Sequence, residues 1–169
     1  GGNMKKLLLA VIVSLSTIST AALADIKVGI ILGFTGPIET LTPAMRDSAK
    51  LAFKEVSDSG ALLGGETITP LIADSTCVDS DAAVAAAELL VSDGVVAIMG
   101  ADCSGVTGAI VTNVAVPNGV TMVSPSATSP GLTSLADNGL FFRTAPSDAK
   151  GGQVLAQVAL DRGLTSVAV

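Results

Sequence analysis

One stretch, residues 95–108, constrains the fold more than any other part of the chain. It opens with five apolar residues, which is the length of a short buried strand. Gly100 then interrupts the apolar run, and Ser104 stands where a helix is expected to begin. A serine hydroxyl and the free N–H groups of a first helical turn suit a small anion such as a carboxylate. The stretch therefore predicts a strand–loop–helix unit with a binding site at its junction.

Apolar runs of strand length alternate with runs of helical periodicity along the rest of the chain. Strands are expected at residues 26–32, 67–73, 95–99, 120–123 and 166–169, a short extended piece at 140–143, and helices at 43–57, 82–91, 106–116 and 148–162. Pro70 suits an edge strand, and Ser80 or Asp81 is expected to cap the second helix. This alternation predicts an α/β fold, an open, Rossmann-like parallel sheet with right-handed crossovers and the strand order 2-1-3-4.

The composition excludes several classes of function. The 169 residues include no histidine, tryptophan or tyrosine, and the formal charge is -6. Without histidine the chain lacks the usual general base and the commonest metal ligand, and its negative charge argues against a nucleic-acid partner. The spacing of Asp74, Asp79, Asp81 and Asp102 matches no calcium loop, so they are expected to cap helices and face solvent. We expect no metal and no cofactor.

An enzyme is also considered and disfavoured. Ser104 sits between a strand and a helix, as a nucleophile does, but its surroundings do not fit G-x-S-x-G. The loop after the first strand does not fit the G-x-G-x-x-G pattern of a dinucleotide site either. The sequence therefore predicts a binding protein rather than a catalyst.

Residues 1–24 are expected to be a secretory signal. Met4 and two lysines begin it, an apolar run covers residues 7–15, and Ala22 and Ala24 are the small residues that a signal peptidase recognises. A buried or membrane helix is the alternative, but the apolar run is short for crossing a bilayer. We expect cleavage after Ala24 and export to the periplasm, with the three residues before Met4 (Gly1, Gly2 and Asn3) lying outside the native sequence.

Cys77 and Cys103 are the only two cysteines, an even pair in a chain expected to reach an oxidising compartment. A disulfide between them would stabilise the fold by roughly 3–4 kcal/mol in the chain-entropy model. The alternative is a reactive thiol at Cys103, activated by the beginning of a helix. The lack of a histidine base favours the disulfide.

The predicted sheet brings three loops to one edge. Ligands of such sheets bind at the carboxyl ends of the strands, near the point where the strand order reverses. The loops at residues 33–38, 100–105 and 124–128 are rich in glycine, serine and threonine and contain no lysine or arginine. A neutral polar cradle of this kind suits a small zwitterion better than a phosphate.

Individual groups of these loops match the two ends of a zwitterion. Ser104 and the N–H groups that follow it, beginning with Gly105, would hold a carboxylate. The hydroxyl of Thr128 and the carbonyl of Ser126 would accept from an ammonium group. The alternative is that Ser104 only caps its helix and that Ser126 and Thr128 only shape a proline turn.

These loops also carry a resemblance to a known family. The stretches concerned are Asp-Ile-Lys-Val-Gly at residues 25–29, Gly36-Pro37, Asp-Ser-Thr-Cys at 74–77, Cys103-Ser104, Ser-Pro-Ser-Ala-Thr-Ser-Pro-Gly-Leu-Thr at 124–133 and Phe-Arg-Thr at 142–144. From residue 25 onward the chain resembles the periplasmic type I solute-binding proteins of ABC transporters, in particular the branched-chain amino acid (Leu/Ile/Val-binding) family.

The resemblance implies a two-lobed clamp that closes on an amino acid or similar small carboxylate and delivers it to a membrane permease. It implies a monomer, a disulfide between Cys77 and Cys103, and ligand contacts from Ser104, Ser126 and Thr128, with Ala127 between the last two. Where relatives often have an aromatic ring after the Gly-Pro, this chain has Leu41, so the pocket floor is expected to differ.

The resemblance also implies a division of the chain. Residues 25–146 would form the first lobe, and residues 147–169 a crossover into a second lobe that is truncated. The alternative function is the ligand-sensing domain of a receptor or regulator, because the same fold serves in such proteins.

Overall fold

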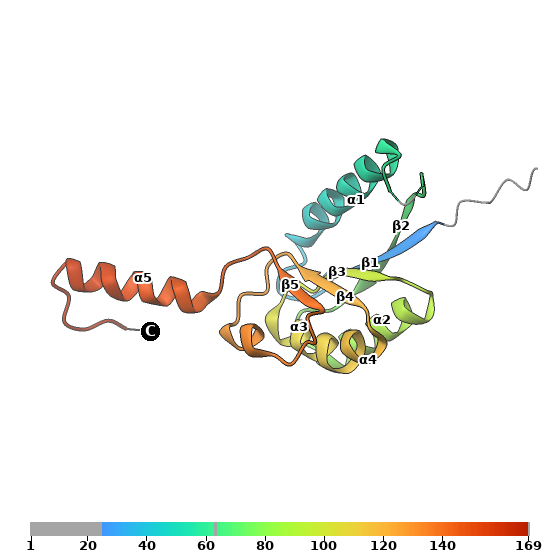
Figure 1. The fold of residues 1–169 in the computed structure, drawn as a ribbon. Coiled ribbons are helices and arrows are strands. Elements are labelled where there is room, and N and C mark those ends of the chain that lie inside the picture. Colours follow the sequence, from blue (N-terminus) through green and yellow to red (C-terminus); the bar gives the residue numbers. More distant parts are fainter. Residues whose placement is uncertain (1–24, 63, 169) are drawn as a thin grey trace, which may run out of the picture.

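The computed structural model describes residues 25–62 and 64–168. These residues form a five-stranded sheet with helices on both faces (Figure 1). The strands are β1 (Ile26–Leu32), β2 (Ile68–Asp74), β3 (Ala97–Gly100), β4 (Thr121–Ser124) and β5 (Phe141–Arg143), and the helices are α1 (Thr42–Ser59), α2 (Ser80–Ser92), α3 (Ser104–Ile110), α4 (Val116–Asn118) and α5 (Asp148–Asp161). The predicted signal, residues 1–24, lies outside the described residues.

The strands follow the order β2-β1-β3-β4-β5, and every neighbouring pair is parallel. The predicted order 2-1-3-4 is thus confirmed. Pro70 lies in β2, at the edge of the sheet, where a missing N–H is tolerated. The fifth strand is β5, which the sequence indicated only as a short extended piece.

Alternation along β1 separates the core into two layers. Ile30 and Leu32 are buried on the side of α1, where they pack with Ala49. Ile31 faces the opposite side and belongs to a larger cluster with residues of α2, α3 and β4, among them Ala87 and Ile110. Figure 1 shows α1 on one side of the sheet and α2, α3 and α4 on the other. The period of two along a strand explains this division.

The helix boundaries follow from their end residues, with one correction. Pro43 lies in the first turn of α1, and Gly60 ends that helix with a φ of 64°. The cap of α2 is Asp79, whose carboxylate accepts from the N–H groups of Asp81 and Ala82, each at 3.0 Å. The prediction of Ser80 or Asp81 was wrong, because Asp79 is the last extended residue and its side chain reaches those two N–H groups.

The helix expected at residues 106–116 runs from Ser104 to Asn118 in three continuous segments. Its middle segment, Val111–Ala115, is a π-helix. Pro117 follows this wide turn and has no N–H to continue the α-helical ladder. In the part of the chain that the structure describes, no helix is both long and apolar enough to cross a lipid bilayer.

The strand expected at residues 166–169 is not formed within the described residues. Residues 164–168 are exposed and have no regular secondary structure. A strand needs a neighbour that pairs with its N–H and C=O groups, and α5 leads the chain away from the sheet (Figure 1). The apolar run is present, but no partner lies beside it.

Candidate functional site

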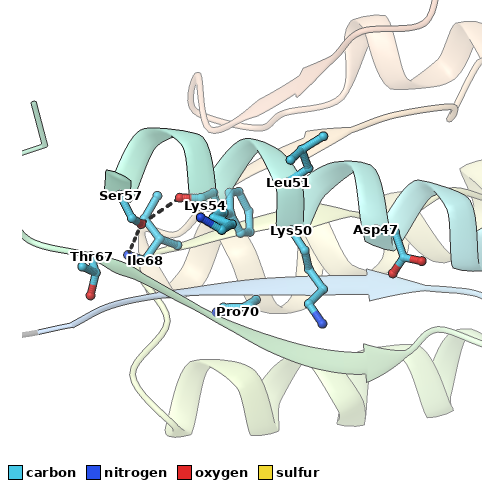
Figure 2. Close-up of a pocket in the computed structure, with 9 residues that line it drawn as sticks. Asp47, Lys50, Leu51, Lys54, Ser57, Thr67, Ile68 and Pro70 are labelled. Carbon is cyan, nitrogen blue, oxygen red and sulfur yellow. Dashed lines mark hydrogen bonds between the residues drawn. The ribbon is translucent and has the colours of Figure 1, made fainter. Parts of the chain in front are cut away.

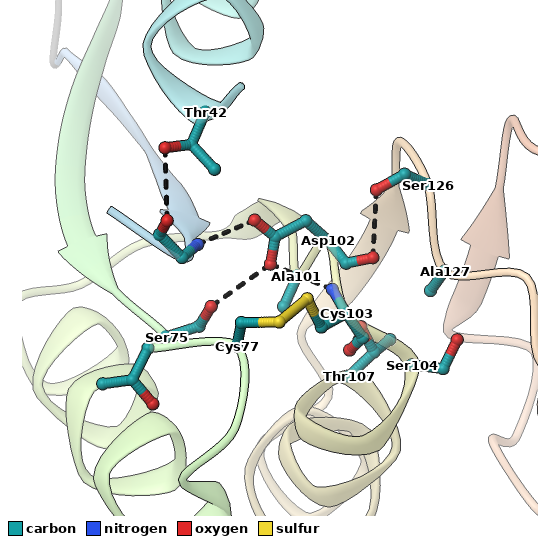
Figure 3. Close-up of a disulfide and its surroundings, with 12 residues drawn as sticks. Thr42, Ser75, Cys77, Ala101, Asp102, Cys103, Ser104, Thr107, Ser126 and Ala127 are labelled. Atoms are coloured by element: carbon teal, nitrogen blue, oxygen red, sulfur yellow. Dashed lines mark hydrogen bonds between the residues drawn. A yellow bond between two sulfur atoms is a disulfide. The ribbon is translucent and has the colours of Figure 1, made fainter. Parts of the chain in front are cut away.

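Asp102 connects the loops at the carboxyl edge of the sheet (Figure 3). Its carboxylate accepts from the N–H of Gly33 at 2.7 Å, the N–H of Cys103 at 2.9 Å and the hydroxyl of Ser75 at 3.3 Å. Its backbone carbonyl accepts from the hydroxyl of Ser126 at 2.9 Å. Asp102 is only 3% exposed, so the prediction that it faces solvent was wrong. The loops after β1, β2 and β4 all converge on this residue.

Neutral donors balance the charge of Asp102. The two ion pairs found among the described residues, Arg46 with Asp47 and Lys54 with Asp58, both lie on α1. Hydrogen bonds to an ionised carboxylate are roughly twice as strong as neutral ones, and two of those that Asp102 receives come from backbone N–H groups. The carboxylate thereby fixes the backbone of the β1 loop relative to the start of α3.

A disulfide joins the loop after β2 to the start of α3. The sulfur atoms of Cys77 and Cys103 are 2.04 Å apart, and the two Cα atoms are 5.2 Å apart (Figure 3). The alternative of a reactive thiol at Cys103 is therefore wrong, because the sulfur is already bonded. The disulfide and the hydrogen bonds of Asp102 to Ser75 and Cys103 thus connect the same two segments, the loop after β2 and the start of α3.

Asp74 organises the loop after β1 from the other side. Its carboxylate accepts from the hydroxyl of Thr35 at 2.7 Å and from the N–H groups of Thr76, Phe34 and Thr35 at 2.8, 3.0 and 3.3 Å. Burial alone would raise the pKa of Asp74, but these hydrogen bonds outweigh it and hold the pKa below its ordinary value. The sequence predicted that Asp74 caps a helix and faces solvent. Its carboxylate instead binds the loop after β1.

Ser104 anchors the loop after β4 to the start of α3. It is the first residue of α3, and Cys103 occupies the N-cap position. Its hydroxyl oxygen accepts from the N–H of Thr128 and from the N–H of Ser129, both at 3.1 Å. The alternative that this hydroxyl only caps its own helix was wrong, because it bonds to a loop 24 residues away. The structure thus brings Ser104 and Thr128 together.

Arg143, the last residue of β5, also holds the loop after β4, and no local sequence pattern predicted this role. Its guanidinium donates to the carbonyls of Ala127 at 3.1 Å and Ser129 at 2.8 Å, and to the hydroxyl of Thr133 at 2.7 Å. Ala127 is fully buried. Arg143 therefore holds the carbonyl groups of Ala127 and Ser129 in one orientation. The other polar groups of this loop remain at the edge of the sheet.

Leu41 and Gly105, which the sequence also predicts as ligand contacts, have less support from hydrogen bonds. Leu41 is 58% exposed and immediately precedes α1, whose first residue, Thr42, donates to the carbonyl of Gly33 at 3.2 Å. Leu41 thus lies in the segment between β1 and α1, whose first residue after the strand, Gly33, is held by Asp102. Gly105 is exposed, and a Cβ there would have no atom within 4 Å. Its N–H belongs to the first helical turn, which has no intrahelical acceptor.

A separate hollow lies between α1 and the beginning of β2. Figure 2 shows the side chains that line it, which are Asp47, Lys50, Leu51, Phe53, Lys54, Ser57, Thr67, Ile68 and Pro70. The hydroxyl of Ser57 bridges helix and strand, donating to the carbonyl of Phe53 at 2.7 Å and accepting from the N–H of Ile68 at 2.9 Å. The hollow lies beside the amino end of β2, away from the edge where α/β sheets bind ligands. We interpret it as a gap in the packing of α1.

The edge built around Asp102 and Ser104 offers binding chemistry. It presents hydroxyl groups, backbone amides and carbonyls held by long-range hydrogen bonds. Among residues 25–62 and 64–168, no group of three or more Cys, Asp or Glu side chains is placed to hold a metal ion. Such an edge can recognise both ends of a small polar molecule.

Comparison with known proteins gives the same family throughout. The profile of the periplasmic binding protein family matches residues 25–169. The Leu/Ile/Val-binding protein BraC3 of Rhizobium johnstonii is 32% identical over 155 residues, and the leucine-specific-binding protein of Salmonella typhimurium is 31% identical over 156 residues. Each alignment covers 92% of this chain and 41% of the relative, so the chain spans about two fifths of the length of these relatives.

A solved structure agrees with the sequence comparison. The branched-chain amino acid transporter substrate binding protein LivJ of Streptococcus pneumoniae, in complex with isoleucine, superposes with a TM-score of 0.65 at 30% identity. The superposition covers 74% of this chain and 35% of LivJ. The likeness therefore extends over about three quarters of this chain and about one third of LivJ.

Proposed function

The chain belongs to the periplasmic binding protein family, and we propose that it is part of the solute receptor of an ABC transporter. The receptor binds an amino acid or a similar small carboxylate in the periplasm and delivers it to a membrane permease. Binding and release need only a shift between open and closed states, with no chemical step, so the proposed protein is not an enzyme.

One observation carries this proposal: three loops of the sheet edge are fixed to one another by hydrogen bonds that leave the N–H groups of Ser104 and Gly105 unused. Asp102 holds the β1 loop to α3, and Ser104 holds the loop after β4 to the same helix start. A rigid cradle loses little entropy when a ligand enters it. The first-turn amides of α3 remain available for an anionic group.

Each end of the ligand has a proposed set of contacts. The N–H groups of Ser104 and Gly105 hold the carboxylate, and the carbonyl of Ser126 and hydroxyl of Thr128 accept from an ammonium group. Leu41, which is exposed, supplies an apolar wall, whereas the predicted contact with Ala127 is limited to its backbone because its side chain is buried. The LivJ structure with isoleucine supports a ligand of this size for a related protein.

We also propose how the chain is divided. Residues 25–146 form the first lobe, and residues 147–169 begin the crossover to a second lobe. The support is that nearly all of α5 is exposed and that it extends away from the sheet (Figure 1). Residues 1–24 are proposed as a signal that is cleaved after Ala24.

The test is calorimetric titration of the complete gene product, without its signal, against the twenty amino acids and a set of small carboxylates. We expect one ligand class to bind, and Gly105→Leu to weaken binding at least 100-fold, because its side chain would occupy the open space beside the α3 amides. Ala85→Leu, at an exposed position of α2, is the matched control and should bind normally. Absence of binding by every compound would contradict the proposal and favour a sensor of another ligand.

A further inference from the structure

Thr128 and Asp148 are joined by two reciprocal hydrogen bonds. The hydroxyl of Thr128 donates to the carboxylate of Asp148 at 2.8 Å. The N–H of Asp148 donates in turn to the carbonyl of Thr128 at 3.0 Å. Asp148 is the first residue of α5, so this pair connects the proposed ligand loop to the segment that leads away from the sheet.

The direction of the hydroxyl hydrogen bond has a chemical consequence. A threonine hydroxyl has one proton and two lone pairs. Because its proton is directed to Asp148, the oxygen of Thr128 can only accept from any further partner. An ammonium group offers three donors to such an oxygen, whereas a ketone offers none.

The surroundings leave space for a further partner at this pair. A hollow is lined by Thr128 and Asp148 together with Pro146, Ser147, Lys150, Gly151, Val154 and Leu155. Thr128 is half-buried and Asp148 is exposed at the beginning of α5. Thr128 belongs both to this hollow and to the proposed cradle, and its proton is directed to Asp148, so a ligand in the cradle would meet the lone pairs of its oxygen.

We propose that Asp148 is a positioning residue that determines specificity: by accepting the proton of Thr128, it makes the Thr128 oxygen an obligate acceptor and selects ligands that carry a protonated amine. This inference rests on the proposed function. Asp148 acts through Thr128, so its role is distinct from that of the ligand contacts themselves.

A purely structural role for Asp148 must be separated from this one. A carboxylate in the first turn also stabilises a helix, so Asp148→Ala could lower affinity by weakening α5 alone. Ser147 provides the control, since its hydroxyl caps α5 by accepting from the N–H of Ala149 at 3.3 Å without contacting Thr128. Ser147→Ala therefore weakens the same helix start and leaves the Thr128–Asp148 pair intact.

The experiment measures discrimination rather than affinity. Dissociation constants are determined by calorimetry on the complete gene product for L-leucine, L-isoleucine and L-valine and for their 2-oxo acid analogues. In Asp148→Ala the hydroxyl of Thr128 is free to turn and donate to the ketone, so the preference for the amino acid should fall at least tenfold. Asp148→Asn keeps an acceptor for Thr128 in its amide oxygen and should retain most of the preference, as should Ser147→Ala.

The possible outcomes separate the two hypotheses. If the unmodified protein prefers the amino acids and Asp148→Ala keeps that preference within twofold, this inference is overturned while the proposed function stands. An equal fall in Ser147→Ala would also overturn it, because the effect would then come from the helix. If the unmodified protein binds none of the six compounds, the inference fails together with this choice of ligand, and the wider titration above decides the proposed function.

Discussion

Replacing Asp102 with asparagine should destabilise the protein more than any other loss of a single negative charge in it. The carboxylate serves the N–H of Gly33 through one oxygen and the N–H of Cys103 and hydroxyl of Ser75 through the other. An asparagine has one acceptor oxygen, so its NH2 group must face one of the two backbone N–H groups. The hydroxyl of Ser75 can reverse its role, but a backbone N–H cannot.

The size of the effect follows from that unavoidable conflict. A buried N–H without an acceptor costs about 1–3 kcal/mol, and the remaining hydrogen bonds lose their charged partner. We expect Asp102→Asn to lower the free energy of unfolding by about 3 kcal/mol, or the melting temperature by roughly 6–12 °C for a chain of this size. The assay is urea unfolding of residues 25–169 followed by circular dichroism. Asp93→Asn, which alters an exposed carboxylate, is the control, and the reasoning is refuted if the two variants differ by less than about 0.5 kcal/mol.

Three further predictions concern the same edge of the sheet. Replacing Cys77 and Cys103 together with serine should lower stability by about 3.5 kcal/mol, because the disulfide closes a loop between residues 26 positions apart, and equal urea midpoints would contradict this. Gly100→Ala should lower the free energy of unfolding by about 3 kcal/mol or more, because φ is 133° there and a Cβ would lie 2.0 Å from the carbonyl oxygen of Ile31. An unchanged melting temperature would disprove this. Because the fold lowers the pKa of Asp74, the ionised carboxylate stabilises the protein above the unfolded pKa of about 3.9, and this contribution is lost as the pH falls through the lower, folded pKa. In acid titrations, Asp74→Asn should therefore lose stability less steeply than the unmodified protein.

The strands could be predicted from the sequence because their signal is local. The first four strands lie in segments that consist mostly of apolar residues, and their predicted bounds differ from the structure by at most two residues. The predicted order 2-1-3-4 is a common one among open parallel sheets, and alternation with right-handed crossovers favours such a sheet without determining the order of its strands. The run at residues 166–169 shows the limit of this reasoning, since an apolar run forms a strand only where a neighbour is present.

The site was predicted in outline but not in its connections. Its loops could be placed because the carboxyl ends of parallel strands share an edge. The hydrogen bonds of Asp102, Ser104 and Arg143 could not be predicted, because, apart from the bond to Cys103, each joins residues at least 10 positions apart. The sequence around Asp102 does not distinguish an aspartate that caps a helix from one that binds three distant loops, so only the folded backbone shows its role.

The order of the strands determines how the chain can fold as it emerges amino end first, which the proposed export would require. β1 pairs first with β2, and β3, β4 and β5 are then added one after another on its other side. After β1, every described strand therefore finds a partner among segments that precede it in the chain, so pairing can proceed as the chain emerges amino end first. The sheet, its disulfide and the loops around Asp102 can all be completed before α5 emerges. Folding of this part would thus keep pace with the proposed export, and the apolar side chains of the sheet would become buried before the remainder of the chain emerges.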